Sequence, residues 1–358
     1  MATAKHGLSP LLFVCVLLLA ICPLIVHAEN IVSRPVGFVR IPVAENGRVL
    51  VSLPFLPFDP SVNSVLADQL TGSSNAASAD RVLKWDATMP AYVQAVKADK
   101  TGNAEVDKKW LTDLETKTVS PLTLSPGEGF WIENRQQTTQ SVYLAGDVVL
   151  DGTNNAVLPP SLSLIAYPYS TGVELDKTTL AGQMAPSDEL TDPSAQPQAF
   201  VLGRGYWYNR KEVSSLAWME IRPYADLFPS DNNPPLIADL KADENGLSVT
   251  LKILCRGAPS ETIDIFYQDG SPTNCFDTRG PWFLAATIPA QGAASVEWTD
   301  SGAQDRSRVD QIFARYYLAG RSDIDADHNN VPDVRERFLA GYQLPPGGST
   351  GHPPGTDL

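Results

Sequence analysis

Short runs of β-branched and aromatic residues, separated by Pro, Gly and Ser, make up most of the chain after its first thirty residues. In residues 247–253, apolar side chains alternate with Ser, Thr and Lys. A period of two is typical of a strand with one buried face, and few stretches show the helical period. The pattern predicts an all-β fold. We expect further strands at residues 81–85, 130–133, 141–144, 263–267, 282–287 and 295–299.

The first predicted hairpin joins residues 38–43 to residues 48–53. Asn46-Gly47 lies between these two apolar runs. This dipeptide favours a type I′ turn because both of its residues tolerate a positive φ. We therefore expect the two strands to pair with each other.

A degenerate repeat divides the first part of the chain. Residues 51–55 (VSLPF) resemble residues 165–169 (IAYPY), and residues 127–131 (GEGFW) resemble residues 203–207 (GRGYW). The order is the same in both copies, which predicts two related β-units, at 29–150 and 151–225, packed as one body. Each Gly-x-Gly precedes an aromatic strand rather than a helix. It therefore indicates a tight turn and not a phosphate site.

A third region follows a linker at 226–235 that is rich in Pro, Asn and Asp. Strands at sandwich-like spacing fill residues 236–320 and predict a two-sheet sandwich. Residues 311–318 fit either a helix or a strand. We interpret them as the last strand of the sandwich, because Gly320 and an acidic segment end the run after eight residues.

The acidic segment carries the clearest chemistry of the chain. Its oxygen donors occupy positions 1, 3, 5, 9 and 12 of a twelve-residue loop that begins at Asp325, and position 7 adds a backbone carbonyl. A calcium ion takes six to eight oxygen ligands, and a short loop supplies them by alternating ligands with spacers. The predicted ligands are Asp325, Asp327, Asn329, the Val331 carbonyl, Asp333 and Glu336.

This loop resembles the calcium loops of EF-hand, dockerin and thrombospondin type 3 modules. Asn330 replaces their usual Gly at position 6, where a left-handed residue is needed and Asn is tolerated. The region before the loop resembles a fibronectin type III-like domain, and the whole layout is similar to modular secreted bacterial proteins of uncharacterised function. An alternative is a solvated acidic turn that caps a helix at 334–339 without binding a metal.

The N-terminus resembles a secretory signal, with Lys5 before an apolar run and a small residue, Ala28, at the cleavage position. No second apolar segment is long enough to span a bilayer, so we expect a secreted protein with no membrane span in its mature chain. The predicted organisation is a signal peptide (1–28), two β-units (29–150 and 151–225), a linker (226–235), a fibronectin III-like sandwich (236–320), a calcium loop with a short helix (321–342) and a disordered tail (343–358).

Charge and rare residues exclude several functions. A formal charge of −14 disfavours nucleic-acid partners. Removal of the signal leaves Cys255 and Cys275, which predict one disulfide in an oxidising compartment, with two separate buried thiols as the alternative. Only His328 and His352 remain, which argues against hydrolases that depend on histidine.

The leading hypothesis is a non-catalytic secreted or cell-surface protein, stabilised by calcium, with an adhesive or scaffolding role and a protein or polysaccharide partner. One alternative is a carbohydrate-binding module, which requires solvent-exposed, coplanar aromatic rings on one sheet face. A second is a hydrolase with paired carboxylates in a cleft. The candidate stacking residues are Trp85, Trp110, Trp131 and Trp207.

Overall fold

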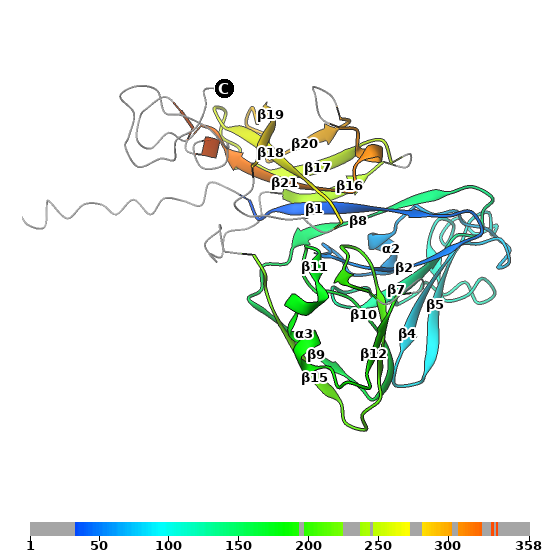
Figure 1. Ribbon diagram of the computed structural model, residues 1–358. Helices are drawn as coiled ribbons and strands as arrows, with labels where there is room; N and C mark the ends of the chain where they lie inside the picture. Colours follow the sequence, from blue (N-terminus) through cyan, green and yellow to red (C-terminus); the bar gives the residue numbers. More distant parts are fainter. Residues whose placement is uncertain are drawn as a thin grey trace, which may run out of the picture.

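The computed structural model describes residues 33–192, 197–224, 237–243, 246–272, 281–302, 307–323, 331–332 and 334–335. Strands dominate this part of the chain, and its helices are short (Figure 1). The prediction of an all-β fold is confirmed. The predicted signal peptide, linker and tail lie outside the described residues.

The first β-unit has two layers. Its first strand, β1 (Val36–Val43), pairs antiparallel with its last strand, β8 (Gln140–Val148). The second layer has the order β2 (Arg48–Ser52), β7 (Gly129–Glu133), β4 (Arg81–Asp86). Strand β3 (Phe55–Leu56) pairs with β8. Strands β5 (Ala91–Lys97) and β6 (Trp110–Leu111) extend the second layer. The unit also contains the short helix α2 (Val62–Val65).

The second β-unit repeats this pairing. Its first strand, β9 (Thr153–Leu158), pairs with its last strand, β15 (Leu216–Ile221). The other layer has the order β10 (Ser161–Ile165), β14 (Tyr206–Arg210), β12 (Glu189–Thr191). The two units are therefore related in topology as well as in sequence. Shorter elements complete the second unit: β11 (Val173–Glu174), β13 (Ala199–Phe200), η1 (Leu175–Lys177) and α3 (Thr179–Gln183).

The repeated motifs of the two units meet each other. Val51 forms a β-bridge with Arg204, and its counterpart Ile165 forms one with Glu128, the counterpart of Arg204. The first motif of each unit thus contacts the second motif of the other unit. This reciprocal contact defines a pseudo-two-fold axis, across which the two units pack against each other.

The Gly-x-Gly segments are turns. Gly127 and Gly203 both take a positive φ, +84° and +76°. The carbonyl of Gly203 accepts a hydrogen bond from Ser52 N at 3.0 Å, and the carbonyl of Gly127 accepts the equivalent bond from Ala166 N at 2.9 Å. A positive φ is readily available only to glycine, which explains why the repeat keeps it. The interpretation of these segments as turns before core strands is confirmed.

The C-terminal strands form a two-layer sandwich. One layer has the order β16 (Ile237–Ala242), β17 (Val249–Leu254), β20 (Ser295–Asp300). The other contains β19 (Phe283–Pro289), β18 (Thr262–Gly270) and β21 (Ala314–Arg321), which follows the short 3₁₀ helix η2 (Val309–Gln311). Residues 314–318 are thus in a strand, as predicted.

Strand β1 joins the sandwich to the first β-unit. β21 pairs antiparallel with β1, so one six-stranded sheet runs β19-β18-β21-β1-β8-β3. In Figure 1, β1 lies between the yellow and orange sandwich and the green and cyan units. We call this six-stranded sheet the central sheet. The region predicted as a separate sandwich therefore shares a sheet with the first unit, although about 270 residues separate β1 from β21.

The middle strands of the central sheet, β1 and β21, are buried on both faces. In β1, Val39 and Ile41 belong to a core shared with the β-units, whereas Val36 and Phe38 belong to the core of the sandwich. Successive side chains of a strand point to opposite faces, so one strand serves two cores. β21 shows the same alternation, with Tyr316 and Leu318 on the first core and Tyr317 and Ala319 on the second.

The predicted hairpin between residues 38–43 and 48–53 is wrong. β1 pairs with β8 and β21, whereas β2 pairs with β7. The turn itself exists, because Gly47 N donates to Ala44 O at 3.1 Å. Of the Asn46-Gly47 pair, however, only Asn46 takes a positive φ, +46°, so the turn is not type I′. It carries the chain from one layer to the other.

Candidate functional site

Most of the predicted calcium ligands cannot be placed. Asp325, Asp327, Asn329, Asp333 and Glu336 lie outside the described residues. Val331, the predicted carbonyl ligand, is described and is 7% exposed. Among the described residues, no three His, Cys, Asp or Glu side chains are grouped so as to hold a metal. The calcium site therefore stays a prediction, and the structure bears only on the segments that flank it.

The segment before the acidic loop is attached to the central sheet. Ser322 N donates to Thr262 O at 3.0 Å, and the hydroxyls of the same two residues are 3.0 Å apart. Arg321 forms an ion pair with Asp323, in which Nη2 lies 2.6 Å from Oδ2. Asp323, which precedes the predicted ligands, therefore already has a cationic partner.

The last part of the loop is attached to the same sheet. Val334 is fully buried and belongs to the core shared with the β-units. Arg335 donates to the buried carboxylate of Asp264 in β18, through Nε at 2.6 Å and Nη2 at 3.1 Å. Thr287 of β19 donates a third hydrogen bond to Asp264 at 2.6 Å. Both ends of the acidic loop are thus fixed to one rigid sheet.

The four tryptophans do not form a flat platform. Trp110 is fully buried and Trp131 is 5% exposed. Trp85 and Trp207 are partly buried, and their rings meet edge to face at 5.6 Å with an interplanar angle of 78°. The Arg48 guanidinium covers Trp131, 4.8 Å from the ring centre. These rings fill cores or pack on one another, and the coplanar arrangement expected for sugar stacking is not present among them.

The predicted disulfide is only half described. Cys255 is partly buried, and the structure shows it unpaired. Burial raises the pKa of its thiol, and Glu261 adds to this effect. Cys275 lies outside the described residues, so the pairing stays a prediction.

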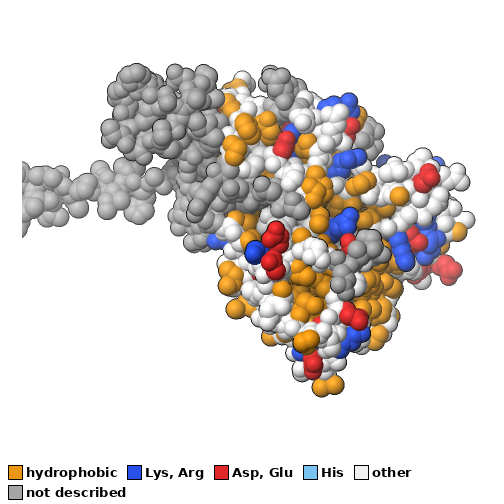
Figure 2. All heavy atoms as spheres, in the orientation of Figure 1, with side chains coloured by type: hydrophobic (Ala, Val, Ile, Leu, Met, Phe, Trp, Pro, Cys, Tyr) orange, Lys and Arg blue, Asp and Glu red, His pale blue; other side chains and the backbone are white. Residues whose placement is uncertain are grey.

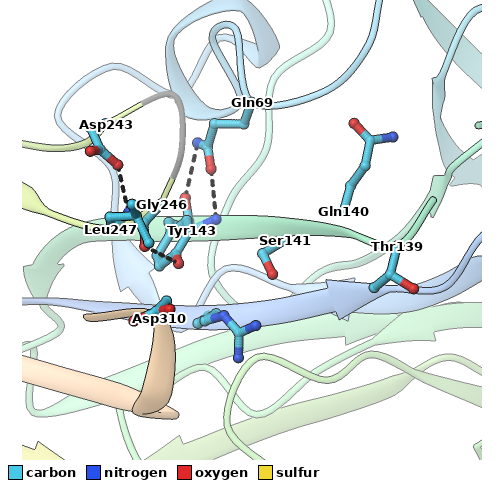
Figure 3. A pocket seen from close by; sticks show the side chains of 10 residues that line it. Gln69, Thr139, Gln140, Ser141, Tyr143, Asp243, Gly246, Leu247 and Asp310 are labelled. Carbon is cyan, nitrogen blue, oxygen red and sulfur yellow. Dashed lines mark hydrogen bonds between the residues drawn. The ribbon is translucent and has the colours of Figure 1, made fainter. Parts of the chain in front are cut away.

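A polar cavity lies where the first β-unit meets the sandwich. It has a volume of about 340 Å³, and we call it the junction pocket. β1 and β8 form its floor, and the β16–β17 turn and η2 form its sides (Figure 3). The side chains that carry its chemistry are Arg40, Ser141, Tyr143, Asp243 and Asp310.

Hydrogen bonds hold the floor of the junction pocket rigid. Gln69 accepts from Tyr143 N at 2.6 Å and donates to Tyr143 O at 3.1 Å (Figure 3). The Tyr143 hydroxyl donates to Gly246 O at 2.6 Å. A Cβ on Gly246 would lie 2.5 Å from this hydroxyl, and the φ of this residue is +64°. Glycine is therefore needed there for the turn to approach the tyrosine.

Charges of both signs surround the tyrosine. Burial raises the pKa of Tyr143, Arg40 opposes the shift, and Asp310 and Asp243 add to it. In Figure 3, the two aspartates lie on either side of the Tyr143 ring. The pocket thus combines one guanidinium with two carboxylates.

Sequence reasoning missed the junction pocket. Its three charged residues come from three distant segments, and no local motif joins them. One signal was available: Arg40 is the only charged residue in β1, whose other side chains are apolar. A charge inside an apolar strand indicates a polar site or an ion pair on one face.

Comparison of the chain with protein-family models, curated proteins and solved structures found no match. Among the described residues, no helix has the length and apolar character needed to cross a bilayer. On the face shown in Figure 2, acidic and basic side chains are interspersed. The function must therefore be argued from the molecule itself.

Proposed function

We propose that the chain is a secreted, non-catalytic β-protein in which calcium fixes the C-terminal segment onto the central sheet, with an adhesive or scaffolding role. The observation that carries this proposal is the Asp264–Arg335 ion pair, together with the buried Val334. A loop whose two ends are held on one sheet loses little entropy when an ion orders it, so binding energy stabilises the fold.

The shared sheet supports the scaffolding role. β1 contributes to two cores at once, which connects the β-units to the sandwich through hydrogen-bonded strands and not through a linker alone. Calcium bound by the acidic loop would add to this rigidity.

Thermal unfolding with calcium and with a chelator tests the proposal. Extracellular calcium loops bind at roughly 10⁻⁴–10⁻³ M, so about 10 mM calcium should saturate the site and stabilise residues 29–358 by about 1–3 kcal/mol. In a chain of this size we expect Tm to rise by roughly 1–4 °C. Magnesium should act more weakly, because it dehydrates reluctantly and requires near-octahedral geometry.

The Glu336→Gln variant is the specific test, because it removes the ligand expected to bind through both oxygens. Its Tm should not respond to calcium, whereas the control Glu297→Gln, which changes an exposed acid of β20, should respond as the wild type does. If the Tm of the wild type is the same with calcium and with chelator, the loop is a capped acidic turn that does not bind calcium.

A further inference from the structure

The two β-units differ in how the outer face of their paired first and last strands is covered. In the first unit, Phe38 of β1 and Tyr143 of β8 belong to the core of the sandwich, so a second β-layer covers this face. Strand β21 also pairs with the other edge of β1. The equivalent strands of the second unit, β9 and β15, lie at the end of the molecule remote from the sandwich (Figure 1). The sandwich therefore covers one of two equivalent faces.

The uncovered face of the second unit is apolar and exposed. Val157 is 72% exposed, Met219 46% and Ile221 56%, whereas their neighbours Leu158 and Trp218 are buried in the core. We call this surface the β9–β15 face; its six side chains, all exposed, are those of Thr153, Asn155, Val157, Ala217, Met219 and Ile221. Among the described residues, no other pair of neighbouring strands exposes three large apolar side chains on one face. Such a patch marks an interaction surface.

The β9–β15 face carries no charge. The acidic residue of β15, Glu220, points to the opposite side, where its carboxylate accepts hydrogen bonds from the Thr179 hydroxyl at 2.8 Å and from Trp218 Nε1 at 2.9 Å. The whole chain has a formal charge of −14, which opposes contact between two copies. A face without charge is where two copies meet with the least repulsion. A charged partner would find no complementary group there.

The covered face of the first unit shows what kind of partner fits. Its cover is another β-layer, whose apolar side chains, such as Leu240 and Leu251, share one core with Phe38. Two sheets that pack in this way interdigitate their side chains over a layer about 10 Å thick. Two identical faces can pack like this around a two-fold axis, so no second kind of surface is needed.

We propose that the β9–β15 face packs against the same face of a second copy of the chain, which gives a two-fold symmetric dimer. Val157, Met219 and Ile221 of each copy lie between the two sheets. A standard interface uses about 20–30 residues on each side, so a face centred on six residues predicts a weak, reversible dimer with Kd between about 1 and 300 μM.

Analytical ultracentrifugation of residues 29–358 over a range of concentrations tests the proposal without any variant. We expect a monomer–dimer equilibrium that is the same with calcium and with a chelator, because the face uses none of the predicted metal ligands. Dimerisation without a calcium response would contradict the proposed function and leave this inference intact. A chain that stays monomeric at about 300 μM would overturn it.

Opposite charges at one position then identify the face. Met219 is the middle residue of the β15 side, so the two copies of this side chain lie near the two-fold axis. Met219→Asp and Met219→Lys should each weaken self-association at least tenfold, because like charges meet across the axis. An equimolar mixture of the two variants should associate at least tenfold more tightly than either variant alone. Val93→Asp, at an exposed apolar position of β5, is the matched control and should dimerise as the wild type does.

Thermal melts separate loss of the dimer from loss of the fold. Because the Met219 side chain is exposed, dilute samples of both variants should melt as the wild type does. If Met219→Asp self-associates as tightly as the wild type, the copies meet through another surface, such as the second edge of β9, and the proposal is wrong. A mixture that associates no better than the single variants would also overturn it.

Discussion

Gly129 and Gly205 meet across the pseudo-two-fold axis of the two β-units. A Cβ on Gly205 would lie 3.1 Å from Gly129 Cα and 2.8 Å from Val51 O. A Cβ on Gly129 would lie 3.2 Å from Ile165 O. The third position of each Gly-x-Gly is therefore glycine because two backbones approach each other there, and not because of its φ.

Two nearby ion pairs occupy equivalent positions in the two units, but their positive and negative partners are exchanged. Lys84 Nζ lies 2.7 Å from Glu128 in the first unit, and Arg204 Nη1 lies 3.1 Å from Asp192 in the second. Glu128 and Arg204 occupy the same position of the repeat. The duplicated units have thus kept a contact while exchanging the charges of its partners.

The close approach of the glycines predicts the effect of a single methyl group. Gly205→Ala should lower the free energy of unfolding by about 1–3 kcal/mol, as overpacking does when the neighbour is backbone that cannot rotate away. Gly182→Ala is the matched control. No atom lies within 4 Å of its added methyl group, and it lies within α3, so it should be neutral or stabilising. Chemical denaturation of both variants would show the contrast, and equal stabilities would contradict the packing argument.

The shared strand predicts that both cores unfold together. Phe38 is fully buried, with its ring 5.8 Å from Tyr143 and 6.3 Å from Tyr317. Phe38→Ala should cost about 3–5 kcal/mol. Because β1 serves both cores, hydrogen exchange should accelerate in β8 as well as in β17. Val213→Ala, at a side chain that is 93% exposed, should change neither. Loss of protection confined to β17 would show that the sandwich unfolds by itself.

A buried carboxyl predicts an unusual pH dependence. Burial raises the pKa of Asp147 to about 6, opposed only in part by Arg34, and Oδ1 has no hydrogen-bond partner among the described residues. The folded pKa lies above the unfolded value of about 3.9, so ionisation destabilises the fold. This penalty is absent below about pH 4, grows between about pH 4 and 6, and is complete above about pH 6.

Asp147→Asn should therefore stabilise the protein by about 1–3 kcal/mol at pH 7, with no gain near pH 3.5. Thermal melts across this range, compared with the exposed control Asp151→Asn, would measure the difference. A gain that does not change with pH would mean that Asn packs better for reasons unrelated to charge.

The anchor of the C-terminal segment can be tested separately from calcium. Arg335→Met removes the cationic partner of Asp264, whose carboxylate is fully buried, and should cost about 2–4 kcal/mol. It should also weaken calcium binding, because the loop would be held at one end only. Asp264→Asn with Arg335→Met removes both charges, and this double variant should recover part of the stability. If Arg335→Met leaves the calcium titration unchanged, the ion pair does not contribute to calcium binding by the loop.

Local sequence signals correctly predicted many strands and the internal repeat. Alternation in β17 places Val249, Leu251 and Ile253 in the core, because a period of two places every second side chain on one face. The repeated Gly-x-Gly turns were also readable, since a positive φ is a property of one residue. Such features depend on neighbours in the chain.

The choice of strand partners did not follow from local signals. Asn46-Gly47 predicted a hairpin, but the turn joins two layers, because β1 pairs with β8 and β21 whereas β2 pairs with β7. The junction pocket was unpredictable for the same reason: Arg40, Tyr143, Asp243 and Asp310 come together only after β1 has joined both bodies.

The sequence by itself determined the strand-rich composition, the duplicated unit and the spacing of the acidic loop, since each rests on residues close together in the chain. Only the tertiary structure decided that β1 completes the sandwich and that Arg335 reaches Asp264. Contacts between segments so far apart form because they remove apolar surface from water, and any charge buried with them needs a partner such as Arg335 for Asp264. Both requirements depend on the whole fold.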